Sequence, residues 1–165
     1  MIIKASENNL KSLILGNHHK DYYNPFWKNE SSIELTGFRF LEEFNLENCD
    51  TFKGGINFSN SPQIKRILLN GSKTSDLTLP VGGVLEELRV PSTITDLKID
   101  SHPTLKDTEF TVGDFDYNSN QYVNNFSRLQ HILIKDCPHI DTYSLICGAS
   151  IYLPDNESIL ESYCI

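Results

Sequence analysis

The chain has 165 residues, of which 39% are hydrophobic and 22% are charged, and this composition is typical of a folded globular protein rather than a disordered one. Such a length suits a single compact domain with its own core, which we expect to span residues 1–165. The formal net charge is −8, from 14 basic and 22 acidic residues. The protein therefore repels a phosphate backbone, and nucleic acid is not an expected partner.

The N-terminal sequence MIIKASENNLKS contains no apolar stretch of the kind that a secretory signal needs, and no segment reaches the ~20 apolar residues of a membrane span. We therefore expect a protein that is cytoplasmic when made and does not insert into membranes. Incorporation into a phage particle is compatible with this expectation, because release by lysis needs no export signal. The four cysteines show no CxxC spacing, so no zinc site is expected and the thiols are interpreted as reduced.

A short apolar pattern, LxxLxL, recurs along the chain. In each copy the last two apolar residues lie on the same face of a short strand. One such strand cannot bury that face alone, so the copies must stack to form a core. The pattern predicts a mainly β fold, an irregular solenoid of short stacked strands with long loops and little helix. The copies occupy residues 10–15, 41–46, 64–69, 85–90, 94–99 and 129–134, with a partial copy at 77–79.

The apolar pattern recurs at its shortest intervals in the middle of the chain. Ile67, Leu77, Leu88 and Leu97 are separated by 10, 11 and 9 residues. This spacing predicts two strands in each coil of the middle section.

Two copies of the pattern resemble the leucine-rich repeat. The segments LEEFNLENCDTF and LQHILIKDCPHI carry Cys49 and Cys137 where that family has asparagine or cysteine. We expect the core of the repeat to consist of Leu13, Leu15, Phe44, Leu46, Cys49, Ile67, Leu69, Leu88, Val90, Leu97, Ile99, Ile132, Ile134 and Cys137.

The segment at 77–105 is similar to the bacterial surface-antigen (BspA-type) variety of the repeat, in which a strand ends in proline and a Ser/Thr-rich turn follows. The similar segments together cover 38–140 well and 8–16 weakly. The resemblance implies a leucine-rich-repeat-like solenoid that binds through an exposed face and needs no cofactor.

Prolines and paired glycines punctuate the predicted strands. Proline cannot donate to a strand ladder, so Pro80, Pro91 and Pro103 are expected to mark strand ends. Gly54-Gly55 and Gly82-Gly83 are expected to supply the positive φ of tight corners. A short helix is expected within 155–163, where Asp and Asn precede a glutamate and apolar residues.

Two segments, 17–36 and 106–126, depart from the repeat and are interpreted as insertions. Loops on a rigid frame commonly carry specificity, and the first insertion contains an aromatic cluster suited to binding. The same cluster is equally suited to covering one end of the solenoid. Its members are Tyr22, Tyr23, Phe26 and Trp27.

The second insertion contains a candidate calcium site. Asp114, Asp116, Asn118 and Asn120 alternate like the first ligands of an EF-hand loop. The segment departs from that pattern at the sixth position, where serine replaces glycine, and at the twelfth, where asparagine replaces glutamate. A solvated loop is therefore the preferred interpretation.

Catalytic motifs are not evident in the sequence. Asp107 and Glu109 are a possible carboxylate pair for glycoside hydrolysis, but nothing in the sequence fixes their separation. The adjacent His18 and His19 point in opposite directions if extended, which is poor geometry for one metal ion. We therefore expect a protein that is not an enzyme.

The sequence favours a non-catalytic protein-interaction or assembly module, as a structural or adhesive component of a phage virion or bacterial surface. The expected partners are proteins, including other copies of the chain or a larger assembly. The alternative is a calcium-dependent glycan binder or carbohydrate-active enzyme that uses the acidic segment at 107–120.

Overall fold

The computed structural model describes residues 2–4, 9–16, 32–36, 38–49, 52–110, 115–116, 121–122, 131–140, 150–153 and 158–161. Within these ranges the structure contains strands and no helix, so the expected mainly β fold is confirmed. The strands are β1 (Ile2–Lys4), β2 (Ser12–Ile14), β3 (Ser32–Thr36), β4 (Glu43–Asn45), β5 (Gly55–Asn57), β6 (Arg66–Leu68), β7 (Asp76–Thr78), β8 (Glu87–Val90), β9 (Asp96–Asp100), β10 (Asp107–Phe110), β11 (Phe115–Asp116), β12 (Gln121–Tyr122), β13 (His131–Lys135), β14 (Ser150–Leu153) and β15 (Ser158–Glu161).

The expectation of a short helix within 155–163 is wrong over residues 158–161, because these residues form the strand β15. This strand pairs antiparallel with β14, so strand pairing overrides the local helix-start signal. In the described ranges no helix exists that has the length and apolarity needed to cross a bilayer.

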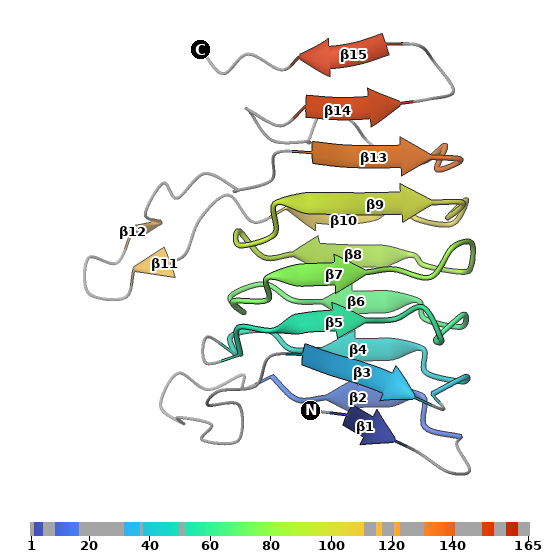
Figure 1. Cartoon of the computed structure of the whole chain (residues 1–165), viewed down its shortest axis with the longest axis vertical. Helices are drawn as coiled ribbons and strands as arrows, with labels where there is room; N and C mark the ends of the chain where they lie inside the picture. The colour runs from blue at the N-terminus through green and yellow to red at the C-terminus, as the bar shows by residue number, and fades with distance from the viewer. Residues whose placement is uncertain are drawn as a thin grey trace.

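Successive strands from β1 to β8 alternate between two parallel sheets. One sheet has the order β1-β3-β5-β7, and the other has the order β10-β8-β6-β4-β2. A third sheet, β15-β14-β13-β9, lies further along the molecule, and Figure 1 shows β9 following β7 in the same layer. The alternation accounts for the short spacing from Ile67 to Leu97, because these residues lie in β6, β7, β8 and β9 in turn.

The parallel pairing aligns apolar residues of successive strands. Phe44 is in register with Ile67, and Ile67 with Leu88. In the facing sheet Ile33 is in register with Ile56, and Ile56 with Leu77. Between the two layers these side chains form one buried cluster. Of the expected core residues, those buried are Phe44, Leu46, Cys49, Ile67, Leu69, Leu88, Val90, Leu97, Ile99 and Ile134; Leu13, Leu15 and Cys137 are partly buried and pack against them, and the side chain of Ile132 lies outside the description.

Several corners between strands share one local design. A residue with positive φ is followed by a buried or half-buried residue whose carbonyl accepts a hydrogen bond from the N–H three residues later. Examples are Asn48 (φ 57°) before Cys49, Ser101 (φ 61°) before His102 and Asp136 (φ 51°) before Cys137. The N–H···O distances that close these three turns are 3.2, 3.2 and 3.3 Å.

The paired glycines behave differently at their two positions. Gly82 has φ +71° and Gly83 has φ +142°, so both have the positive φ that was expected of a corner. Gly54 and Gly55 do not have positive φ, and that expectation is wrong. Gly55 instead lies in β5, where an added Cβ would stand 3.3 Å from the Cβ of Asp76.

Truncation of a core ring tests the importance of the stacked apolar row. Phe44 is fully buried, and its ring meets Phe58 edge to face with centroids 5.1 Å apart. We expect Phe44→Ala to lower the free energy of unfolding by about 3 to 5 kcal/mol, through lost burial and a cavity. Ile14→Ala is the control, because Ile14 is 53% exposed, and it should cost under about 0.5 kcal/mol. Urea unfolding measures both, and equal losses would contradict the assignment of the core.

Candidate interaction surface at the seam between β7 and β9

The strand ladder is interrupted between β7 and β9. Each is an edge strand of its own sheet, although the two lie next to each other and run along the same layer. We call this interruption the seam. Proline at position 80 contributes to it, because proline has no N–H to donate at the end of β7.

Hydrogen bonds near the two ends of the strands hold the seam together. Gly82 N–H donates to Asp100 O at 2.9 Å. The Nε2–H of His102 donates to Pro80 O at 2.9 Å, and at the other end the Thr93 hydroxyl donates to Thr74 O. Side chains thus replace part of the missing ladder.

His102 is fully buried at this corner. Because a carbonyl only accepts hydrogen bonds, Nε2 carries the proton, and Nδ1 of the neutral ring is a buried acceptor without a protein partner. Burial lowers the pKa of His102 below its ordinary value of 6.5. The neutral ring is therefore the form that suits the fold.

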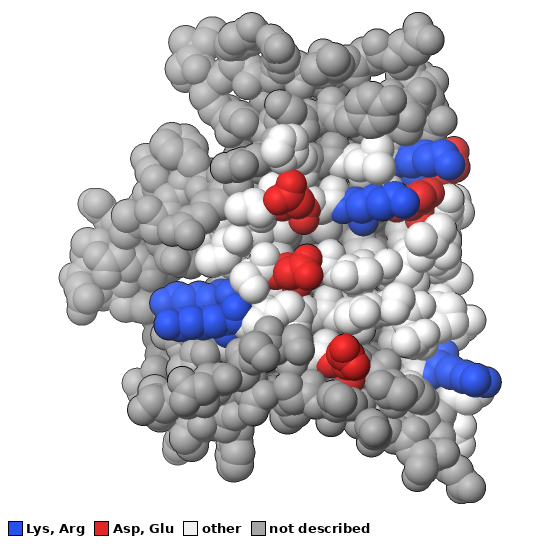
Figure 2. All heavy atoms as spheres, in the orientation of Figure 1, with Lys and Arg blue, Asp and Glu red and all other residues white. Residues whose placement is uncertain are grey.

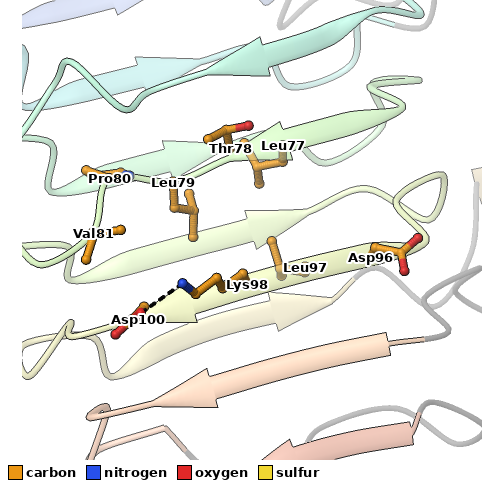
Figure 3. A pocket seen from close by; sticks show the side chains of 9 residues that line it. All are labelled: Leu77, Thr78, Leu79, Pro80, Val81, Asp96, Leu97, Lys98 and Asp100. Carbon is orange, nitrogen blue, oxygen red and sulfur yellow. Dashed lines mark ion pairs between the residues drawn. The ribbon is translucent and has the colours of Figure 1, made fainter.

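The seam opens into a cavity of about 380 Å³. Leu79 and Leu97, from opposite sides of the seam, are almost buried, whereas Val81 is 75% exposed. Lys98 reaches along its own strand to Asp100, with an N···O distance of 3.0 Å (Figure 3). The lining residues are Leu77, Thr78, Leu79, Pro80, Val81, Asp96, Leu97, Lys98 and Asp100.

Carboxylates lie where the seam begins. Asp76 and Asp96 are the first residues of β7 and β9, and both are exposed. Asp96 accepts hydrogen bonds from the Thr95 hydroxyl at 2.6 Å and from His131 Nδ1 at 2.9 Å, and these two contacts lower its pKa. Figure 2 shows acidic side chains spaced down the middle of this face. The start of the seam is acidic because both of these carboxylates are exposed there, whereas Lys98 lies further along β9 and is paired with Asp100.

On the opposite sheet, the charged side chains pair with one another. Glu42 lies between Lys11 at 2.7 Å and Lys65 at 2.8 Å, and hydrogen bonds from these two lysines lower its pKa from 4.5 to about 2. Arg66 pairs with Glu43 at 2.9 Å. Just before each strand of this sheet lies a charged residue, and the sign of the charge alternates from one strand to the next. These residues are Lys11, Glu42, Lys65, Glu86 and Lys106. Since these charges already have partners or close opposite neighbours, the seam is the better candidate for binding another molecule.

Most of the candidate site residues singled out from the sequence are outside the described ranges. The aromatic cluster of Tyr22, Tyr23, Phe26 and Trp27 is outside the described residues, as are His18, His19, Asp114, Asn118 and Asn120. The backbone of Asp116 lies in β11, opposite Gln121.

Asp107 and Glu109 both lie in β10, and the Asp107 side chain is exposed. In the part of the chain that the structure describes, no three His, Cys, Asp or Glu side chains gather as metal ligands would. The proposed calcium loop is therefore not tested by the described side chains.

Comparison of the chain with protein-family models, with curated proteins and with solved structures gave no match.

The Glu42 ion pairs predict sensitivity to acid. A carboxyl whose pKa is lowered from 4.5 to about 2 stabilises the fold above pH 4.5, and this contribution disappears as the pH falls toward 2. We expect Glu42→Gln to lose less stability than the wild type over that interval, as measured by urea unfolding at successive pH values. Asp107→Asn is the control, since Asp107 is an exposed acid of the same sheet, and parallel curves for wild type and Glu42→Gln would contradict the prediction.

His102 predicts a second pH dependence at higher pH. Its depressed pKa means that the unfolded chain binds the proton more readily, so stability is full above 6.5 and falls as the pH drops below that value. His102→Gln keeps an N–H donor without a titrating group, and it should flatten the dependence of the unfolding free energy on pH between about 7 and 5. The exposed His139, changed to Gln, should leave the slope unaltered.

Proposed function

We propose that the chain is an irregular leucine-rich-repeat-like β solenoid that acts as a non-catalytic protein-interaction or assembly module. Supporting the solenoid is the alternation of strands between two parallel sheets, with apolar partners in register from rung to rung. The sequence resemblance to leucine-rich repeats over 38–140 points in the same direction.

The observation that carries the proposed function is the seam. The interruption between β7 and β9 is lined by a cavity of about 380 Å³ that the fold leaves open, and an open apolar cavity with a few polar groups at its margin is a candidate binding site. An exposed apolar residue, Val81, and an acidic margin lie along the same line. Binding on a rigid strand frame requires no bound cofactor.

Within this proposal the chain is a structural or adhesive subunit of a phage virion or bacterial surface. Its described sheets end in edge strands, with β2 and β10 at the two sides of one sheet. A subunit built into a larger particle covers such edges with neighbouring chains.

Association of the purified chain tests the proposal. We expect light scattering at micromolar concentration to give a mass larger than that of one chain, alone or with extract of the producing cell, and mass spectrometry of intact particles to recover the protein. A chain that stays monomeric under both conditions and is absent from particles would contradict an assembly role.

Calcium distinguishes the alternative. A calcium-dependent glycan binder or carbohydrate-active enzyme would melt at a higher temperature with calcium, and Asp114→Ala with Asp116→Ala would remove that shift. A glycan-binding or hydrolytic activity that disappears with the same substitutions would replace the assembly proposal.

A further inference from the structure

We propose that the seam between β7 and β9 binds an extended segment of a partner protein that carries a basic residue and, about four positions away, an aliphatic or aromatic residue. This inference rests on the proposed function and adds to it the place and the chemistry of binding. Its occupant is a peptide segment in extended conformation rather than a helix or a small molecule.

The far end of the seam is apolar. Val81 is 75% exposed, the highest exposure among the large hydrophobic residues in the described ranges, and it lies at the mouth of the 380 Å³ cavity. Leu79, two residues before Val81, also lines this cavity and is nearly buried. A single aliphatic or aromatic side chain placed here removes Val81 from water and fills space that the fold leaves open.

The near end of the seam is acidic. Asp76 and Asp96 are exposed, and their only described basic neighbour in ion-pair distance is His131, which lies 2.9 Å from Asp96. Lys98, the lysine within the seam, already pairs with Asp100. A lysine or arginine of the partner would therefore meet two exposed carboxylates, of which Asp76 has no described ion-pair partner, whereas an acidic partner would be repelled.

The distance between the acidic and apolar ends of the seam sets the number of residues between the basic and apolar side chains of the peptide. Gly82 N–H donates to Asp100 O, so Val81 lies level with the end of β9, four residues beyond Asp96. An extended chain rises ~3.3 Å per residue, and a segment running along the seam must therefore separate its basic and apolar residues by about four positions.

The straight course of the seam also favours an extended occupant. Its acidic and apolar ends lie about four strand residues apart, or ~13 Å, and the side chains of an extended segment that lies over the cavity reach both ends.

Selection from a phage-displayed library of short random linear peptides tests the proposal. The full chain is the bait, and fluorescence anisotropy with synthetic peptides measures the affinity of those enriched. We expect a consensus with Lys or Arg about four positions from an apolar residue, and binding that weakens as salt is raised.

Variants on the two ends of the seam locate the binding. Val81→Asp should weaken binding about tenfold or more, because it places a charge in the apolar end. Asp76→Lys and Asp96→Lys should each weaken binding about threefold to tenfold; Asp76 is included because Asp96 also contacts His131 and Thr95. Ile14→Asp and Asp107→Lys, at exposed positions of the opposite sheet, are the matched controls and should leave affinity unchanged.

Three results would overturn the proposal: no peptide enriched on wild type over Val81→Asp, a consensus without a basic residue, or equal binding by wild type and the seam variants. Each of these leaves the assembly role itself standing, because that role is judged by light scattering and by recovery from particles. Conversely, a chain that binds peptides at the seam but never associates would support the peptide-binding inference and contradict the assembly role.

Discussion

Apolar side chains at equivalent positions of successive strands, such as Phe44, Ile67 and Leu88, are held in register by parallel pairing and packed into one core. The strands of this core are only three to five residues long, so none of them could bury its apolar face alone. Stability is therefore shared along the stack, and each strand depends on its neighbours. Everything exposed on the two layers takes its position from that inner row.

Corners repeat as regularly as the strands. A residue in the left-handed region, whether Asn48, Gly71, Ser101 or Asp136, reverses the chain. The next residue turns inward, and in these four places it is a cysteine, a serine or a histidine. Small or hydrogen-bonding side chains suit this place because the corner is buried yet surrounded by main-chain carbonyls. At His102 the corner side chain also bridges to the segment that follows β7, through Pro80 O.

The two faces of the molecule differ in how their charges are used. On the sheet of β2 to β10, ion pairs such as Lys11–Glu42–Lys65 link one strand to the next. Exposed pairs of this kind contribute little stability each, but alternating signs favour the observed register over a shifted one. Near the seam, Asp76 and Asp96 add to an acidic margin beside an apolar opening. This difference is the reason why we propose the seam as the binding surface.

The sequence by itself determined the mainly β class, the positions of seven of the fifteen described strands and many of the inward-facing residues, because the LxxLxL spacing encodes which side chains share a face. The positive φ of Gly82 and Gly83 was also predicted correctly from the sequence, since paired glycines in a loop indicate positive φ. Only the tertiary structure decided that Gly55 belongs to a strand against Asp76, and that residues 158–161 pair as β15 rather than forming a helix.

The seam likewise had no local signal beyond Pro80, because it arises from two strands some twenty residues apart that lie side by side without forming a ladder. Its hydrogen bond from His102 depends on the corner that follows β9, which no local spacing in the sequence specifies. Local periodicity fixes what a strand buries; which strand edges stay unpaired is a property of the whole stack.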